Sequence, residues 1–209
     1  MIKKILCVGG SPRAGGNSDI LIGHFIKGAQ DVNITAEEIR LRDYKFQTCT
    51  GCEKCRKDKI CSGLNDDMQF IYPKIIESAG LILVSPVHNY NITAIMKSFI
   101  DRLYCFYDFD DERPGNWSSR LGKQGRKAVI AAVGEQIGDE ESGMNLALKA
   151  MRLPLEALGY EIIAELSVTG VFKKGKVLQY PESLNSAESL GKRLGNIVKD
   201  YKTTDFPEI

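Results

Sequence analysis

Four cysteines lie within thirteen residues of this chain, in the pattern C-x2-C-x2-C-x5-C. Three thiolates at x2 spacing wrap around one face of an iron–sulfur cubane, and a fourth a few residues later closes a [4Fe–4S] centre. Zinc also binds thiolates, although its usual sites place two C-x2-C pairs further apart, and thiols without a metal are redox-active. The sequence therefore leaves a cluster, free thiols and zinc as alternatives at Cys49, Cys52, Cys55 and Cys61.

The cysteine segment is also rich in basic residues. Cations near a thiol lower its pKa, which favours both metal ligation and oxidation. We expect this effect from Lys54, Arg56, Lys57 and Lys59. The two other cysteines, at positions 7 and 105, fall in a hydrophobic strand and a helix, where we expect simple buried thiols.

A glycine-rich loop, GGSPRAGGNS, follows the first hydrophobic run. Ser11, Arg13, Asn17 and Ser18, with the free N–H groups of a helix start, supply the donors that a phosphate monoester needs. Neither GxxxxGK[ST] nor GxGxxG is present, so the loop has neither the motif for a nucleoside triphosphate nor the motif for a dinucleotide. The loop predicts a single terminal phosphate, with an ordinary turn and helix cap as the alternative.

Two further loops follow hydrophobic strands, SPVHNYNIT and GEQIGDEESG. The first offers backbone donors, amides and an aromatic ring, which suit a planar heteroaromatic ligand with one polar edge. From the second we expect backbone contact to that ring at Gly134, Glu135 and Gly138, or else a flexible connection. His88 is either a proton donor or, as we favour, a solvated histidine. The residues concerned in the first loop are Pro86, Val87, His88, Asn89, Tyr90 and Asn91.

Hydrophobic periodicity predicts five strands alternating with helices. The second strand alternates apolar and polar residues, which is typical of an edge, whereas the first and third are almost continuously apolar, as in a buried parallel sheet. We expect Asn17 or Ser18, and Asn65 or Asp66, to cap helices. The predicted strands are 2–8, 33–42, 79–87, 127–134 and 160–169, and the predicted helices are 19–30, 66–78, 92–104, 141–158 and 184–201.

This alternation predicts an α/β fold with a doubly wound five-stranded parallel sheet, flavodoxin-like, in strand order 2-1-3-4-5. In that order the three loops converge on one edge of the sheet, where ligands bind. We expect one domain over residues 1–209, with a cysteine-rich loop at 49–61 and an irregular, aromatic excursion at 106–125.

Composition excludes several classes of partner. The 209 residues, 43% of them apolar, carry a net charge of only +1, so no long-range field favours nucleic acid or an anionic membrane. In the N-terminal sequence MIKKILCVGG, glycine follows before an apolar segment of signal-peptide length has formed, so we expect no export signal. No window has the roughly 18 apolar residues of a spanning helix. A cytoplasmic location is the expectation.

Three motifs carry a family resemblance: GSPRxxGNS, SPVHNYNITAxMKSFIDR and LGKxGRKA. With them, the chain resembles the NADPH-dependent FMN reductase and iron–sulfur flavoprotein family over nearly its whole length. The resemblance implies FMN, with its phosphate held by Ser11, Pro12, Arg13, Asn17 and Ser18 and its isoalloxazine lined by residues 86–91. It also implies a compact cysteine motif, although relatives keep similar cysteines without a cluster.

The implied function is an FMN-dependent oxidoreductase that takes electrons from NAD(P)H or an electron carrier and passes them to a small acceptor. Its chemistry lies in the flavin, so no catalytic side chain is expected. One alternative is electron transfer through a [4Fe–4S] cluster with ferredoxin-like partners, and another is a non-catalytic thiol or zinc sensor. The aromatic excursion predicts a homodimer or homotetramer.

Overall fold

Five parallel strands form the centre of the molecule, in the order β2-β1-β3-β7-β8. The computed structural model describes residues 2–112, 115–137 and 143–201. The strand order is the predicted one, and the fold is flavodoxin-like. These strands are β1 (Ile2–Gly9), β2 (Thr35–Arg40), β3 (Ser78–His88), β7 (Lys127–Val133) and β8 (Glu161–Val168).

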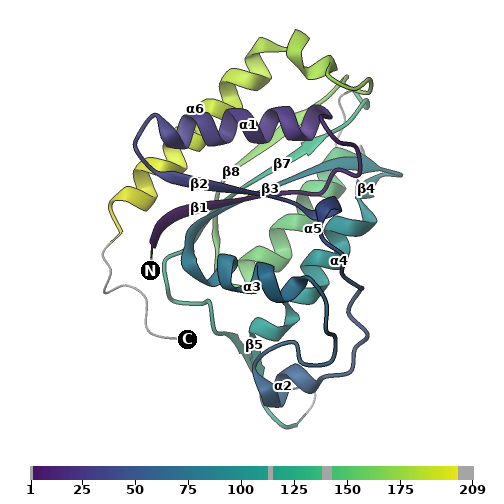
Figure 1. The fold of residues 1–209 in the computed structure, drawn as a ribbon, viewed down its shortest axis with the longest axis vertical. Helices are drawn as coiled ribbons and strands as arrows, with labels where there is room; N and C mark the ends of the chain where they lie inside the picture. The colour runs from purple at the N-terminus through teal and green to yellow at the C-terminus, as the bar shows by residue number, and fades with distance from the viewer. Residues whose placement is uncertain (1, 113–114, 138–142, 202–209) are drawn as a thin grey trace.

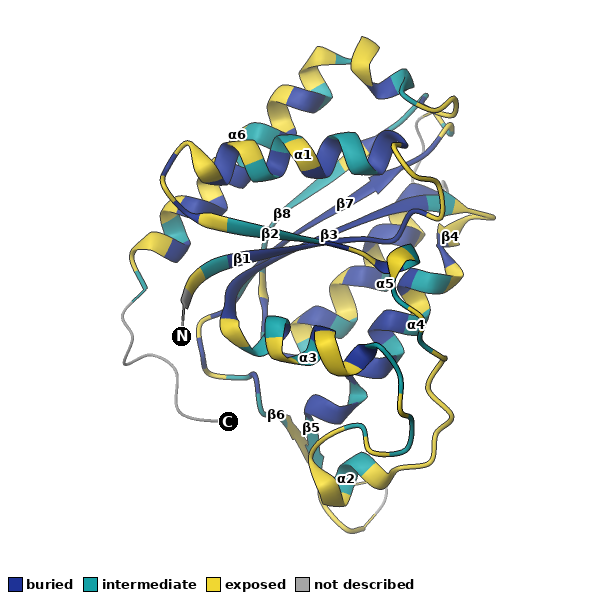
Figure 2. Ribbon diagram, viewed as in Figure 1, coloured by how far each residue is buried: buried dark blue, intermediate teal, exposed yellow. Residues whose placement is uncertain are grey.

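Helices cover both faces of this sheet (Figure 1). On one face lie α1 (Asn17–Gln30) and α6 (Pro181–Lys199). On the other lie α3 (Met68–Glu77), α4 (Ala94–Arg102) and α5 (Gly143–Ala157). Strands β1, β3 and β7 are dark blue along most of their length in Figure 2, because both of their faces are covered. Among the described residues no helix is long and apolar enough to cross a membrane.

A small ribbon and a short helix extend from one end of this layered body, at the bottom of Figure 1. Strands β5 (Tyr107–Phe109) and β6 (Trp117–Ser119) pair antiparallel, and α2 (Lys54–Asp58) lies beside them. The predicted excursion is therefore regular in part. Across the ribbon, the rings of Tyr107 and Trp117 pack edge to face with their centroids 5.3 Å apart. Positions 113–114 of the excursion lie outside the described residues.

Helix and strand boundaries follow the predictions with some differences. The cap of α1 is Gly16, without a side-chain hydrogen bond, so the expected cap at Asn17 or Ser18 is wrong. Helix α4 is capped by Thr93 and continues into a 3-10 turn at Leu103–Phe106. Helix α6 begins at Pro181, whose missing N–H costs nothing in a first turn. The first two residues of the predicted helix 141–158 are not described.

Arg126 is fully buried at the other end of the sheet, before β7. Its Nη1 donates to the carbonyls of Ile75 and Ser78, both at 2.7 Å, and its Nη2 donates to Ile76 at 2.7 Å. The Ile75 and Ile76 carbonyls lie in the last turn of α3, and Ser78 is the residue at which α3 ends and β3 begins. The basic motif LGKxGRKA therefore has a structural role here, because it closes the end of a helix.

A second buried arginine ties the cysteine segment to the body. The Arg102 guanidinium, at the end of α4, binds both carboxylate oxygens of Asp66 at 2.6 and 3.0 Å, and it also donates to the Gln47 carbonyl at 2.8 Å. The side chains of this pair are only 1% and 6% exposed. Burial opposes ionisation of Asp66, but hydrogen bonds from Arg102, Gln47 and Met68 hold its pKa below the ordinary value.

We expect Asp66→Asn to lower the free energy of unfolding by about 3–5 kcal/mol, because it leaves a buried guanidinium without its counter-charge. Urea denaturation measures the change. The matched control is Asp101→Asn, in an exposed pair with Lys97, which should cost less than about 1 kcal/mol.

The pH dependence follows from the lowered pKa of Asp66. The stabilisation is complete above the ordinary Asp pKa and is lost as the pH falls through the lower, folded value. The difference between wild type and Asp66→Asn should therefore disappear in acid, and a difference that persists there would contradict this account of the ion pair.

Candidate functional site

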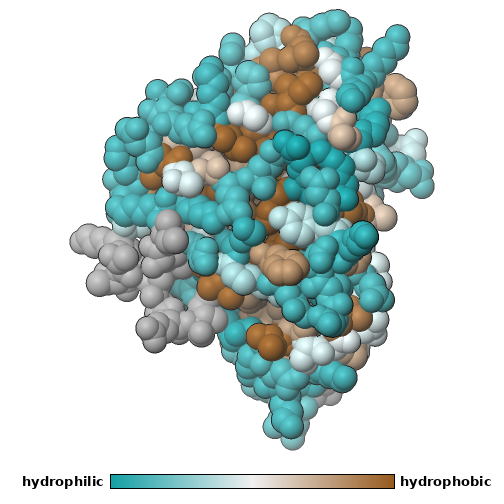
Figure 3. All heavy atoms as spheres, in the orientation of Figure 1, coloured by the Kyte–Doolittle hydropathy of each residue, from teal (hydrophilic) through white to brown (hydrophobic). Residues whose placement is uncertain are grey.

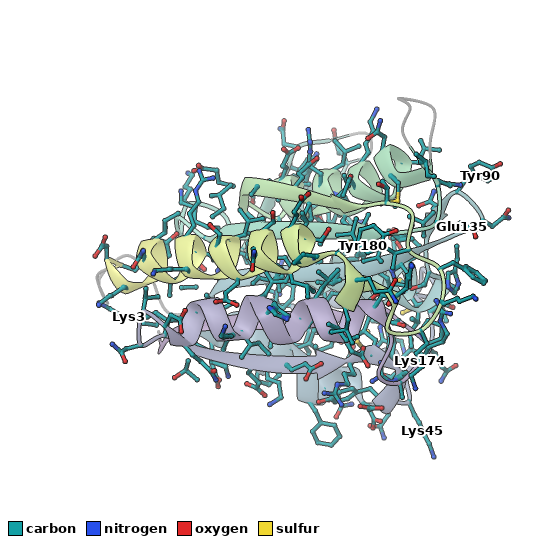
Figure 4. The ribbon with its side chains drawn as sticks, turned by 90° about the horizontal axis from the view of Figure 1, so that it is seen from above. Lys3, Lys45, Tyr90, Glu135, Lys174 and Tyr180 are labelled. Carbon is teal, nitrogen blue, oxygen red and sulfur yellow. The ribbon has the colours of Figure 1, made fainter. Side chains whose placement is uncertain are left out.

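A cavity of about 310 Å³ lies at the carboxyl ends of the parallel strands. The loops after β1, β7 and β8 contribute to it together with the last residues of β3, as the convergence of strand ends in a doubly wound sheet requires. Figure 4 shows this end of the molecule, with Tyr90, Glu135 and Lys174 together and Lys3 at the opposite end. Nine of the predicted binding residues line the cavity: Ser11, Arg13, Asn17, Ser18, Pro86, Val87, His88, Gly134 and Glu135.

The first loop is shaped by a half-buried ion pair that the sequence did not reveal. Gly15 has a φ of +63°, which favours glycine, and its N–H donates to Asp19 at 2.7 Å. Arg42 grips the two carboxylate oxygens of Asp19 at 2.9 and 2.8 Å and also donates to the Ser11 carbonyl at 3.2 Å. Arg42 thus both holds the loop and neutralises a carboxylate that would repel a phosphate.

Two of the predicted phosphate ligands bind the loop after β8. The Asn17 amide donates to the Lys173 carbonyl at 3.0 Å and accepts from the Val177 N–H at 3.2 Å. The Arg13 guanidinium lies 5.8 Å from the centre of the Phe172 ring and donates to its carbonyl at 3.4 Å. What Asn17 offers a phosphate is therefore its backbone N–H in the first turn of α1.

Lys174 approaches the same loop from the β8 side. Its Nζ lies 3.5 Å from the position that a Cβ atom on Gly15 would occupy. With Lys173 and Lys176 it lines a hollow of about 500 Å³ that shares Phe172 with the main cavity. These lysines were not among the residues predicted for the site, although the run KKGK after a predicted strand was the available signal.

The second loop is a tight hairpin between β3 and β4 (Asn91–Ile92). Its two central residues, Asn89 and Tyr90, have φ values of 46° and 68°, as a primed two-residue turn requires. Tyrosine is strained in this conformation, and its side chain is 60% exposed. Asn89 and Tyr90 line a neighbouring hollow of about 230 Å³ with Val87, Glu135 and Gln136.

Other predicted residues have different surroundings. Pro12 and Asn91 do not line the main cavity, and the Asn91 side chain accepts from the Ile92 N–H at 2.8 Å. Gly134 lines it, but its N–H donates to Val168 and its carbonyl accepts from Val171, both at 2.9 Å. The Gly134 N–H is therefore not free to donate to a ligand. Gly138 lies outside the described residues.

The four clustered cysteines line one separate cavity of about 270 Å³, with Tyr104 on its wall. Cys49 and Cys52 are exposed, whereas Cys55 and Cys61 are half-buried. A Cβ on Gly63 would lie 2.4 Å from the Cys52 sulfur, so glycine at this position gives that sulfur its room. The structure thus brings all four predicted ligands to one space, in keeping with a multi-sulfur centre.

The thiols differ in their electrostatics. The backbone N–H of Lys54 lowers the pKa of Cys52, and the Lys54 charge adds to this. Burial, and then the neighbouring thiols of Cys61, Cys49 and Cys52, raise the pKa of Cys55. Within the described ranges no three side chains converge closely enough to hold a single metal ion.

Two of the cations expected to lower the thiol pKa values bind the ribbon instead. Arg56 donates to the Asp110 carbonyl at 2.6 Å, and Lys59 donates to the Asp108 carboxylate at 2.5 Å. Arg120 in turn donates to the Lys59 carbonyl. These contacts anchor the segment between the cysteines, and the effect of Arg56 and Lys59 on the thiol pKa values stays a prediction.

The remaining cysteines agree with expectation. Cys7 is fully buried in β1, and Cys105 is 3% exposed in the 3-10 turn after α4. Burial raises the pKa of both thiols, that of Cys105 to about 12. The cysteine cavity and the cavity at the strand ends share no lining residue. The described residues therefore form two separate cavities with different linings.

Comparison with known proteins identifies relatives over most of the chain. Residues 3–163 match the family model of NADPH-dependent FMN reductase. An iron-sulfur flavoprotein of Archaeoglobus fulgidus is 34% identical over 68% of this chain, which spans 60% of that relative's length. An iron-sulfur flavoprotein of Methanocaldococcus jannaschii is 27% identical over 95% of this chain and 99% of its own.

The fold also matches solved structures. An NAD(P)H:quinone oxidoreductase from Methanothermobacter marburgensis superposes with a TM-score of 0.71, over 93% of this chain and 100% of its own, at 17% identity. This likeness supports the fold that the strand order defines.

We expect Arg42→Gln to weaken FMN binding by roughly 10- to 100-fold, as loss of a charge-assisted contact of about 1.5–3 kcal/mol predicts. The variant leaves Asp19 beside the phosphate without its counter-charge. Fluorescence titration of the apoprotein measures the dissociation constant. Riboflavin, which lacks the phosphate, should bind wild type and variant equally.

Arg40→Gln is the matched control, because Arg40 is exposed and pairs with Glu38 on the edge strand. It should leave both affinities unchanged. An equal loss for riboflavin and FMN in Arg42→Gln would show that Arg42 supports the general fold and has no specific part in phosphate binding.

Proposed function

Because the chain belongs to the NADPH-dependent FMN reductase family, we propose that it is an FMN-dependent oxidoreductase that takes electrons from a reduced nicotinamide nucleotide and passes them to a small acceptor. The observation that carries this proposal is the cavity at the strand ends. One end of it has the donors of a phosphate loop and the rest has apolar walls, from Val87, Val133 and Phe172 among others.

The residues of this cavity fit FMN. Bound flavin supplies the capacity to accept a hydride and to release electrons singly or in pairs. The chain's own contribution is to bind and orient it. Ser11 and Ser18 are buried at the phosphate end, where the first-turn N–H groups of α1 attract an anion, and Lys174 adds a positive charge. We assign the isoalloxazine to the wall formed by residues 86–88 and 133–135.

The four-cysteine cavity favours a second function, electron transfer with a redox carrier protein. Cys49, Cys52, Cys55 and Cys61 would hold a [4Fe–4S] cluster, which exchanges single electrons. Supporting observations are the common cavity, the room provided by Gly63, and the relatives named iron-sulfur flavoproteins. The comparisons give no support to the third alternative, a non-catalytic sensor.

Location and assembly are part of the same proposal. No disulfide joins any of the six cysteines, which suits the reducing cytoplasm. We propose that the chain forms homo-oligomers. Trp117 and Tyr90 expose 52% and 60% of their surface, while Phe106, also predicted for the interface, is buried within its own chain. The visible face in Figure 3 shows only scattered brown residues among teal ones, so an interface there would be mixed in polarity.

We expect FMN, and not FAD, to co-purify, because the phosphate loop has room for a terminal phosphate and lacks the dinucleotide motif. NADPH or NADH should bleach the flavin band near neutral pH under anaerobic conditions. Mass spectrometry of the released flavin and stopped-flow absorbance test the two parts. Bound FAD, or FMN that neither nucleotide reduces, would contradict the proposal.

Anaerobic protein should contain about four irons and four sulfides per chain. Cys52→Ser should lose the iron and keep FMN, since the two cavities share no residue. Cys7→Ser is the control, because Cys7 lies in β1 away from that cavity. If anaerobic reconstitution gives no iron while NAD(P)H still reduces the flavin, the cluster assignment fails and the simple reductase stands. Iron without nicotinamide activity would favour the electron-transfer function.

A further inference from the structure

A basic hollow of about 500 Å³ lies on the loop after β8, beside the main cavity. Lys173, Lys174 and Lys176 line it together with Phe172 and Gln179, and no carboxylate is among the described residues of its wall. The whole chain has a net charge of only +1, so three lysines without an acidic neighbour in the wall are a local concentration of positive charge. Such a hollow favours a ligand with concentrated negative charge.

The backbone that carries these lysines is held by contacts at both ends of the loop. The Tyr180 hydroxyl donates to the Gly170 carbonyl at 3.2 Å, and the Lys176 N–H donates to the Lys173 carbonyl at 3.0 Å. The same Lys173 carbonyl accepts from the amide of Asn17, which is only 4% exposed. The hollow is therefore formed before any ligand arrives, so little of the binding free energy is lost in ordering the loop.

The three ammonium groups have different surroundings. That of Lys174 approaches Gly15 in the phosphate loop, so its charge acts on the FMN phosphate. That of Lys176 donates to the Gln179 side chain and lies 5.9 Å from the centre of the Tyr180 ring. Neither the Lys173 nor the Lys176 ammonium donates a hydrogen bond to the described residues of the phosphate loop. These two lysines are left for a second anion.

Phe172 joins the hollow to the main cavity, because it lies in the walls of both. It is 61% exposed, and the Arg13 guanidinium lies 5.8 Å from the centre of its ring. Figure 4 shows Lys174 at the same end of the molecule as Glu135, which lines the main cavity. A ligand that enters the main cavity therefore reaches the lysines by crossing Phe172, and an exposed aromatic ring offers a surface on which a purine base stacks.

The chemistry of the proposed electron donor provides such an anion. NADPH differs from NADH by one phosphate monoester, on the ribose of its adenosine. A monoester carries close to two negative charges at neutral pH and has three acceptor oxygens. Each phosphate of the pyrophosphate that both nucleotides share carries one charge. A hollow with several ammonium groups suits the monoester better.

We propose that this hollow binds the 2′-phosphate of NADPH, with Lys173 and Lys176 as its ligands and Phe172 against the adenine, and that it selects NADPH over NADH. The inference rests on the proposed reductase function and names its donor. The chemical step is the same for both nucleotides, so the hollow acts on binding alone. Lys173 and Lys176 are thus specificity-determining residues and not catalytic ones.

The test uses FMN-loaded protein and the double variant Lys173→Gln/Lys176→Gln. Calorimetric titration with adenosine 2′,5′-bisphosphate and with AMP measures binding without any reaction. The variant should bind the bisphosphate roughly 10- to 100-fold more weakly, as expected for lost charge-assisted contacts, and AMP equally well. The kcat/KM for NADPH should fall by a similar factor while that for NADH stays the same. Higher ionic strength should weaken binding of the bisphosphate to wild type more than to the variant.

Lys149→Gln/Lys192→Gln is the matched control, since it makes the same change in net charge at exposed positions of α5 and α6. It should leave the binding of both adenosine ligands unchanged. The FMN content of Lys173→Gln/Lys176→Gln should equal that of wild type, whereas Lys174→Gln should weaken FMN binding. This contrast distinguishes the hollow from the phosphate loop.

The outcomes separate the inference from the function on which it rests. Equal losses for NADPH and NADH in Lys173→Gln/Lys176→Gln would assign the lysines to the shared pyrophosphate and overturn the inference. Loss of FMN with unchanged nucleotide selectivity overturns it as well, and so does wild-type protein that binds the bisphosphate no more tightly than AMP. A wild-type flavin that neither nucleotide reduces overturns the reductase function itself, whereas a reducible flavin with unchanged selectivity in the variant overturns this inference alone.

Discussion

The rest of the structure depends on a parallel sheet that is buried on both faces. Strands β1, β3 and β7 are almost entirely apolar, and helices cover them from both sides. Polar side chains are costly in such a layer, so the groups that could do chemistry are displaced to the loops beyond its edges. Because all five strands run in parallel, the loops at their carboxyl ends face one another. The cavity at that edge follows from the topology.

Three arginines, two buried and one half-buried, bind the backbone of segments that have no regular hydrogen-bond ladder. A loop that lies against the core must satisfy its backbone groups without a regular ladder. Arg42 does this for the phosphate loop, Arg102 for the cysteine segment and Arg126 for the end of α3. A guanidinium suits this task because its donors spread in a rigid fork, which grips several oxygens at once. Each of the three joins segments that are far apart in the sequence.

The sequence predicted the five strands, their order and most of the residues around the main cavity, because these follow from periodicity and turn chemistry. It could not predict that Asn17 binds the loop after β8, or that Arg56 and Lys59 anchor α2 to the ribbon. An amide or cation in a loop has the same appearance in a sequence whether it meets a ligand or a distant carbonyl. The contacts of Lys174 and Arg42 were missed for the same reason, since both span the fold.

Both cavities must compensate negative charge, and they do so with different groups. A flavin phosphate and a set of thiolates both bring negative charge to a partly buried position, which has a cost unless donors compensate it. The phosphate loop uses the first turn of α1 with Arg42 and Lys174, whereas the cysteine cavity uses the backbone N–H and the charge of Lys54. The donors of the first site are close to the main sheet, while those of the second depend on an ion pair and a ribbon outside it. A substitution among the residues that hold one cavity should therefore change the groups bound in that cavity. Because the two sets of residues are separate, the two cavities can be altered independently.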